Sequence, residues 1–125
     1  MKRALPLLAF ALAGCATLAP APPGPTAALG QRADVGGVRI RPLAIVEDSR
    51  CPMNARCVWA GRLILEVEIG FNGGSEEFRG NLTLGEPLAL GHEVVTLVAA
   101  APEKLAGAQT PARAYRFTFA VQRQP

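Results

Sequence analysis

The sequence predicts an all-β fold: a single small antiparallel β-sandwich or open barrel of about seven strands. Three observations support this prediction. Several short segments alternate apolar and polar residues, which is the period of a half-buried strand. Clusters of Gly, Pro and Asn separate these segments, and no segment shows a convincing helical pattern. Once the N-terminal segments are set aside, about 95 residues remain, which is enough for one small domain.

The N-terminus has the three parts of a bacterial lipoprotein signal peptide. Residues 1–3 are basic in character, residues 4–13 form an apolar run too short to span a bilayer, and Leu12-Ala13-Gly14-Cys15 resembles a lipobox. We therefore expect residues 1–14 to be cleaved, and Cys15 to carry the lipid that anchors the protein in the membrane. A short buried helix that ends in a cysteine is the alternative interpretation.

A flexible tether is expected over residues 15–30. Residues 16–30 contain four prolines and two glycines, a composition typical of a spacer with polyproline character. Ala16 stands where an aspartate is the familiar signal for inner-membrane retention, so the expected location is the outer membrane, facing the periplasm, if the host is Gram-negative. Without residues 1–14 the chain has 11 basic and 10 acidic residues, which argues against a nucleic-acid-binding surface.

The β-domain is expected over residues 31–125. Its strand-like segments, in chain order, lie at residues 31–35, 38–41, 43–46, 62–69, 76–79, 82–84, 88–90, 92–100 and 114–121. Pro42 has no N–H to donate and predicts a bulge or an edge position between the second and third segments. Asn72-Gly73 predicts a hairpin, and Gly80-Asn81 predicts a break in the returning strand. Residues 102–112 contain two prolines and a glycine and predict a loop.

Three of these segments predict where the core lies. In residues 62–69 one face is wholly apolar, and its members are Leu63, Leu65, Val67 and Ile69. In residues 114–121 the apolar face carries Tyr115, Phe117, Phe119 and Val121. Residues 92–100 are so rich in valine and leucine that we expect a long, largely buried strand.

Two of the three cysteines and the only tryptophan lie in one stretch, residues 48–61. Cys51 and Cys57 enclose five residues that suit a tight polar loop, and in an exported protein we expect them to form a disulfide. With Cys15 assigned to lipid, no cysteine is left over. We expect Trp59 to pack against the disulfide or the core.

The same stretch resembles a known family. Asp48-Ser49-Arg50-Cys51-Pro52, followed by Cys57-Val58-Trp59-Ala60-Gly61, is similar to the D-S-R-C-P…C-x-W-A-G signature of small, mostly uncharacterised bacterial lipoproteins and secreted proteins. The resemblance covers roughly residues 30 to 70. It implies a secreted all-β domain with a disulfide at the signature, and it implies no catalytic residues.

The charged residues of the signature allow two interpretations. In the first, Asp48 accepts hydrogen bonds from backbone N–H groups of the loop, and Arg50 pairs with it or covers the disulfide. In the second, the loop is a rigid recognition element, because arginine and aromatic residues are frequent interface anchors. The candidate binding residues are then Arg50, Met53, Arg56 and Trp59.

The sequence offers no catalytic constellation. His92 is the only histidine, and we expect it in a surface turn. A zinc site at Cys51, Cys57 and His92 would lack a fourth ligand. Glu66 and Glu68 share one strand face, as paired carboxylates of a glycosidase must, but a solvated face is the simpler interpretation. We therefore expect no enzymatic activity, no metal and no cofactor.

These observations lead to two functional hypotheses. The preferred one is a membrane-anchored, non-enzymatic binding or envelope-assembly module, which presents the disulfide-stapled loop to a protein of the bacterial cell envelope. The alternative is a periplasmic carrier of a small ligand or a metal. Its pocket would lie between the sheets and be lined by residues that would otherwise form an ordinary core, namely Phe78, Leu97, Phe117 and Phe119.

Overall fold

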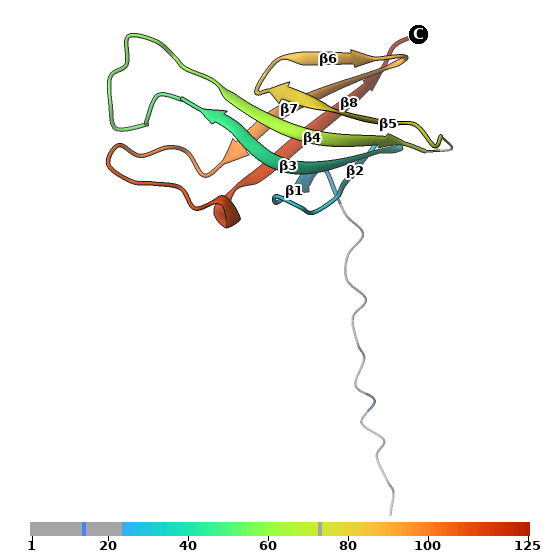
Figure 1. Ribbon diagram of the computed structural model, residues 1–125, viewed down its shortest axis with the longest axis horizontal. Coiled ribbons are helices and arrows are strands. Elements are labelled where there is room, and N and C mark those ends of the chain that lie inside the picture. The colour runs from blue at the N-terminus through green and yellow to red at the C-terminus, as the bar shows by residue number, and fades with distance from the viewer. Residues whose placement is uncertain (1–13, 15–23, 73) are drawn as a thin grey trace, which may run out of the picture.

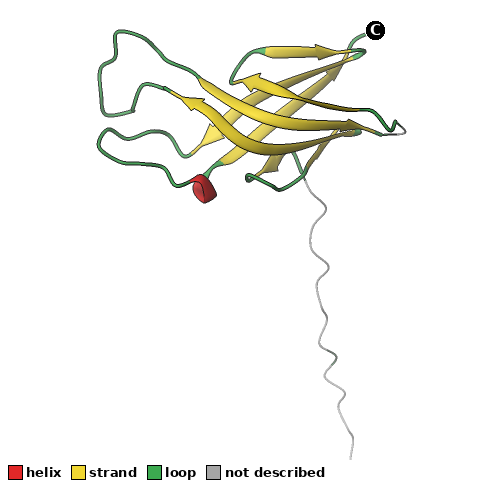
Figure 2. Ribbon diagram, in the orientation of Figure 1, coloured by secondary structure: helices red, strands yellow, loops and turns green. Residues whose placement is uncertain are grey.

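The computed structural model describes residues 14, 24–72 and 74–125, in which eight strands form two antiparallel four-stranded sheets. The sheets pack face to face as a β-sandwich and do not close into a barrel (Figures 1 and 2). The strands are β1 (Thr26–Ala27), β2 (Ala33–Val35), β3 (Val38–Asp48), β4 (Leu63–Phe71), β5 (Glu77–Thr83), β6 (Pro87–Leu90), β7 (Glu93–Ala101) and β8 (Arg116–Arg123). The predicted all-β class is thus confirmed, and of its two forms the sandwich is the one observed.

One sheet has the order β1-β8-β7-β6 and the other has the order β2-β3-β4-β5. Within the described residues the only helical element is a short 3₁₀ turn, η1 (Ala112–Ala114), just before β8. None of the helical segments in this part of the chain is long and apolar enough to cross a membrane. The predicted signal peptide, apart from Gly14, and the predicted lipidation site Cys15 lie outside the described residues.

The domain begins earlier than the sequence predicts. Strand β1 lies inside the segment expected to be tether, and it pairs with β8 through Thr26 and Thr118. Just before it, the carbonyl oxygen of Pro25 accepts a hydrogen bond of 2.9 Å from Phe119 N. Ala27 and Ala28 are buried. Their small side chains fit against the core, but a strand of two residues is too short to leave a recognisable pattern.

Strand β3 is continuous through Pro42. The predicted bulge is confirmed, because the register with β4 shifts between Pro42 and Ala44 and again between Ile45 and Glu47. The edge position also holds locally, because β2 pairs only with Val38–Ile40 and ends before Pro42, whose carbonyl oxygen accepts instead from Gly30 N at 2.7 Å. In β4 the predicted core face is fully buried, from Leu63 through Ile69 on alternate residues.

Two strand predictions fail for local reasons. Strand β5 runs unbroken through Gly80, so the predicted break is wrong. Residue 80 is glycine for another reason, because a Cβ there would overlap the ring of Phe78. The glycine therefore leaves room for the ring and still pairs with Val67. Strand β7 is buried on one face only, through Val95 and Leu97, and a register shift after Leu97 leaves Val98 exposed.

The core between the sheets is wholly apolar among the described residues. Its largest fully buried side chains include Phe117, Ile40, Leu63, Leu65, Ile69, Leu82 and Leu97. The hairpin turns β2–β3, β4–β5 and β6–β7 lie at one end of the sandwich. At the other end two long loops, residues 49–62 and 102–115, project beyond the sheets (Figure 1).

Candidate functional site

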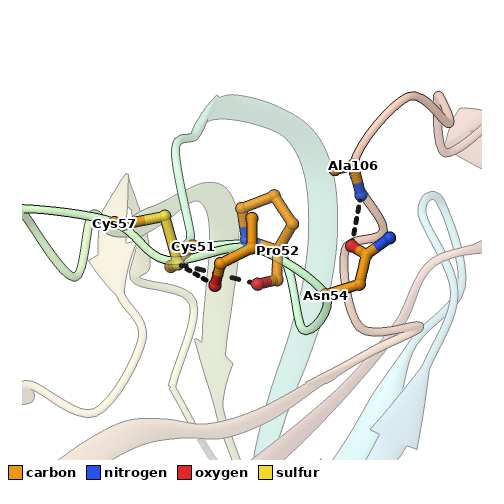
Figure 3. Close-up of a disulfide and its surroundings, with 6 residues drawn as sticks. Cys51, Pro52, Asn54, Cys57 and Ala106 are labelled. Atoms are coloured by element: carbon orange, nitrogen blue, oxygen red, sulfur yellow. Dashed lines mark hydrogen bonds between the residues drawn. A yellow bond between two sulfur atoms is a disulfide. The ribbon is translucent and has the colours of Figure 1, made fainter.

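The connection between β3 and β4 holds the signature residues and is called the disulfide loop here (residues 49–62). Its base continues the β3–β4 ladder, since Ser49 N donates to Arg62 O at 2.8 Å and Cys51 N donates to Ala60 O at 3.1 Å. The predicted disulfide joins Cys51 and Cys57, whose Cα atoms are 5.8 Å apart (Figure 3). This separation is typical of a disulfide, and the covalent bond closes the tip of the loop into a small ring.

Gly61 allows the disulfide loop to close on itself at its base. Its φ is +68°, a region that residues with a Cβ rarely adopt, and a Cβ there would overlap the carbonyl oxygen of Ser49. The chain can therefore return towards β4 this close to its outgoing strand only if residue 61 is glycine. The backbone geometry thus explains why the signature ends in glycine.

A second loop supports the first. The connection between β7 and β8, called the neighbouring loop here (residues 102–115), lies beside the disulfide loop. Met53 N donates to Lys104 O at 2.9 Å, and Ala106 N donates to Asn54 Oδ1 at 2.8 Å (Figure 3). Lys104 Nζ donates to the backbone oxygen of Asp48 at 2.7 Å. Segments about 50 residues apart in sequence therefore fix one another.

An ion pair anchors the base of both loops. Arg50 donates to the Asp48 carboxylate through Nε at 2.8 Å and through NH2 at 3.0 Å. Arg50 also donates to the carbonyl oxygens of Ala100 and Pro102, at 3.2 Å each. The side chains of Asp48 and Arg50 are only 8% and 14% exposed. Arg50 is thus a brace between the two loops, and the prediction that it is an exposed binding contact is wrong.

Tyr115 completes this network. Its hydroxyl donates to Asp48 Oδ2 at 2.7 Å, and its ring stacks on Phe117 with the centroids 5.7 Å apart. The sequence places Tyr115 on the apolar face of the last strand but does not indicate its partner, which is 67 residues away. The ion pair of the first interpretation of Asp48 and Arg50 is thus observed, with Tyr115 as an additional hydrogen-bond donor, and the recognition role of the loop stays a prediction.

The network shifts the pKa values of its members in directions that preserve it. Burial raises the pKa of the Asp48 carboxyl, but the hydrogen bonds from Arg50 and Tyr115 and the charge of Arg50 outweigh burial and hold the pKa below its ordinary value. Burial, followed by the hydrogen bond to Asp48, raises the pKa of the Tyr115 hydroxyl. Asp48 is therefore ionised and Tyr115 neutral over a wide range of pH, as a structural brace requires.

The outer surface of this end is unusually apolar. The two loops together with the strand ends that lead into them, residues 46–62 and 98–116, are called the loop end here. Among the described residues, the exposed large hydrophobic side chains are four in the loops, Met53, Val58, Trp59 and Leu105, and two in the adjoining parts of β3 and β7, Val46 and Val98. Of the predicted binding residues, Met53, Arg56 and Trp59 are exposed. The prediction that Trp59 packs against the disulfide or the core is wrong, because 82% of its surface is accessible.

The titratable residues considered for catalysis are not brought together. His92 is exposed in the β6–β7 turn, at the end opposite the disulfide, so it does not meet Cys51 and Cys57. Glu66 accepts a hydrogen bond of 2.9 Å from Arg79, and Glu68 lies on the same outer face of β4. In the part of the chain that the structure describes, no three His, Cys, Asp or Glu side chains gather as metal ligands.

A groove opens between the sheets at the hairpin end, opposite the loop end. Its volume is about 930 Å³, and its apolar lining includes Val38, Phe71, Phe78, Leu90 and Val121. Charged side chains at its rim include Glu76, Glu77, Glu93 and Arg123. Only Phe78 of the residues predicted to line a pocket belongs to this groove. The other three, Leu97, Phe117 and Phe119, are core residues.

No protein-family model, curated protein or solved structure matches this chain in sequence or fold comparisons. The resemblance of residues 48–61 to a lipoprotein signature therefore stays a prediction.

Proposed function

We propose that this protein is a non-enzymatic binding module of the bacterial cell envelope, which presents the disulfide loop to a partner there. The observation that carries this proposal is the gathering of the exposed large hydrophobic side chains at the loop end. Exposed apolar side chains scattered singly over a surface need no explanation, but a group confined to one end is typical of an interaction site.

The rigidity of the loop end supports the same function. The disulfide, Gly61, the contacts between the two loops and the Asp48–Arg50 pair all restrict residues that carry no part of the core. A loop held in one conformation before binding loses less conformational entropy when it binds. Most of the signature therefore serves as a support, whereas its exposed member Trp59 and the adjacent Val58 serve as contacts.

We propose further that the chain is a lipoprotein. Cleavage after residue 14 would leave Cys15 as the lipidated first residue, and the module would lie at the outer membrane, facing the periplasm, in a Gram-negative host. Metabolic labelling with an alkyne analogue of palmitate tests this. The wild-type chain should take up the label and the Cys15→Ser variant should not, whereas equal labelling of a Cys51→Ser variant and the wild type serves as the control.

The binding proposal is tested by photo-crosslinking in living cells. A photoreactive residue at Val58, which is 88% exposed, should give a discrete adduct. The same residue at Glu86, in the exposed β5–β6 turn, is the matched control and should give none. Either a protein or a lipid adduct specific to Val58 supports the proposal. Absence of an adduct at Val58, in protein shown to be folded and exported, contradicts it.

A second function is favoured by one specific observation, the groove of about 930 Å³ at the hairpin end. An apolar lining with charged residues at the rim suits a small amphiphilic ligand. Native mass spectrometry of the protein purified from its host tests this function. A carrier should retain a ligand mass that a Leu90→Trp variant, which narrows the groove, loses. An unliganded mass for wild-type protein and variant alike would contradict it.

A further inference from the structure

The loop end differs from the rest of the domain in charge as well as in exposed apolar surface. It holds six basic residues and three acidic ones, whereas the remaining described residues hold five basic and seven acidic ones. The basic residues of the loop end are Arg50, Arg56, Arg62, Lys104, Arg113 and Arg116. The domain is therefore polarised, with positive charge concentrated at the end that carries the exposed hydrophobic side chains.

Ion pairing leaves the net positive charge of the loop end unchanged, because each pair takes up one basic and one acidic residue. Asp48 is occupied by Arg50 and Glu47 by Arg62, so two of the three acidic residues are neutralised at the base of the loop. Among the described residues, Arg56 and Arg113 are exposed and lie within ion-pair distance of no carboxylate. These side chains stay available to an anionic partner.

We propose that the loop end docks on the surface of an anionic lipid bilayer, with Val58 and Trp59 in the headgroup region and the arginines on lipid phosphates. The proposal rests on the function proposed above and names the partner of the disulfide loop. Tryptophan is enriched at membrane interfaces because its ring is apolar and its N–H can still be hydrogen-bonded. The arginine guanidinium fits phosphate oxygens through two parallel hydrogen bonds.

The shape of the loop end favours a bilayer over a protein. The disulfide loop is a narrow projection beyond the sheets (Figure 1), and its most exposed apolar residues, Val58 and Trp59, are 88% and 82% accessible. Side chains that stand out to this extent need a recess if the partner is a protein, whereas a bilayer accepts them at any position. A loop contact of this kind also adds to a lipid anchor, because stable membrane attachment usually requires two signals.

The test uses the intrinsic fluorescence of the protein. Trp59 is the only tryptophan in the chain, so its emission reports the environment of the disulfide loop alone. The full chain is mixed with vesicles of equimolar phosphatidylglycerol and phosphatidylcholine, and separately with vesicles of phosphatidylcholine. We expect a blue shift and quenching by brominated acyl chains with the anionic vesicles, a much weaker effect with the neutral ones, and a loss of the effect at high salt.

Charge variants locate the interaction. Arg56→Gln and Arg113→Gln should each weaken partition into anionic vesicles by about fivefold, the effect typical of one basic residue near such a surface. Arg41→Gln is the matched control, because Arg41 is also exposed but lies on β3 outside the loop end. This control should bind as the wild type does. Equal losses in all three variants would overturn the proposal, since net charge alone would then explain the binding.

Two further outcomes would also overturn it. The first is that the protein floats with the vesicles while the Trp59 emission stays unshifted. The N-terminal segment alone would then attach the protein to the bilayer, and the disulfide loop would not contact it. Unshifted emission together with a discrete protein adduct at Val58 in cells would overturn the lipid partner and leave the binding function standing. The two proposals therefore fail in distinguishable ways.

Discussion

Adjacent carboxylates at the end of β3 provide a test of the brace that holds both loops. Asp48 and Glu47 each pair with an arginine, but the side chains of Asp48 and Arg50 are 8% and 14% exposed, whereas those of Glu47 and Arg62 are 39% and 63% exposed. The substitutions Asp48→Asn and Glu47→Gln remove one charge each and preserve side-chain size. Their effects on stability should nevertheless differ widely.

The expected magnitude follows from burial. Removing one partner of a fully buried ion pair costs about 3–5 kcal/mol, because the other charge is left without compensation. Asp48 and Arg50 keep slight contact with water, so we expect about 2–3 kcal/mol for Asp48→Asn. For the exposed pair of Glu47 and Arg62 we expect less than about 1 kcal/mol. Replacing Arg50 by Met in the Asp48→Asn background should restore part of the loss, because it removes the unpaired charge.

The assay is urea unfolding followed by far-ultraviolet circular dichroism, with the slope checked for equality between variants. The pH dependence gives a second readout. The pKa of Asp48 lies below its ordinary value of 3.8 in the folded protein, so its stabilising contribution is present above that value and is lost as the pH falls through the folded pKa. Asp48→Asn should lack this part of the acid transition. Equal destabilisation by Asp48→Asn and Glu47→Gln would refute the reasoning.

Three further predictions concern the loop end, and each can be measured by the same unfolding assay. Gly61→Ala should cost clearly more than Gly85→Ala, because both glycines have positive φ but only at Gly61 would a Cβ overlap the backbone; similar losses would contradict this. Tyr115→Phe should cost about 1–2 kcal/mol by removing a hydrogen bond to a carboxylate. Because the pKa of Tyr115 is raised by folding, its own contribution persists below the ordinary value of 10.0 and is lost as the pH rises through the folded pKa, so the phenylalanine variant should lack this alkaline loss. Replacing Cys51 and Cys57 by serine should cost about 2 kcal/mol, as a ring this short predicts, and leave a folded domain with a much lower crosslinking yield at the loop; outright unfolding would assign the disulfide to the fold instead.

The sequence predicts the parts of this fold that depend on local alternation. In β4 every second residue from Leu63 is apolar, and this period requires one buried face wherever the strand lies in the sandwich. Other features depend on tertiary contacts that no local pattern carries. Strand β1 is recognisable only through its pairing with β8, and Gly80 resembles a strand break until the ring of Phe78 is seen to lie over it.

The candidate site shows the same division. The disulfide could be predicted because Cys51 and Cys57 have a short spacing and the third cysteine, Cys15, is expected to carry a lipid. The exposure of Trp59 could not, since tryptophan is usually at least partly buried and only the course of the loop decides its surroundings. The role of Tyr115 could not be foreseen either. An Asp and an Arg two residues apart indicate a pair, but nothing in their neighbourhood indicates a third partner 67 residues away.

The most direct measurement is the crosslinking yield at Val58 in living cells, compared between the wild-type chain and the Trp59→Ser variant. Trp59 is almost fully exposed, so the substitution should leave the free energy of unfolding within about 0.5 kcal/mol of the wild type. A contact surface that depends on Trp59 should lose most of the adduct at unchanged stability. An unchanged yield, or a loss of stability as large as the loss of binding, would contradict the claim that this end of the sandwich is built for binding.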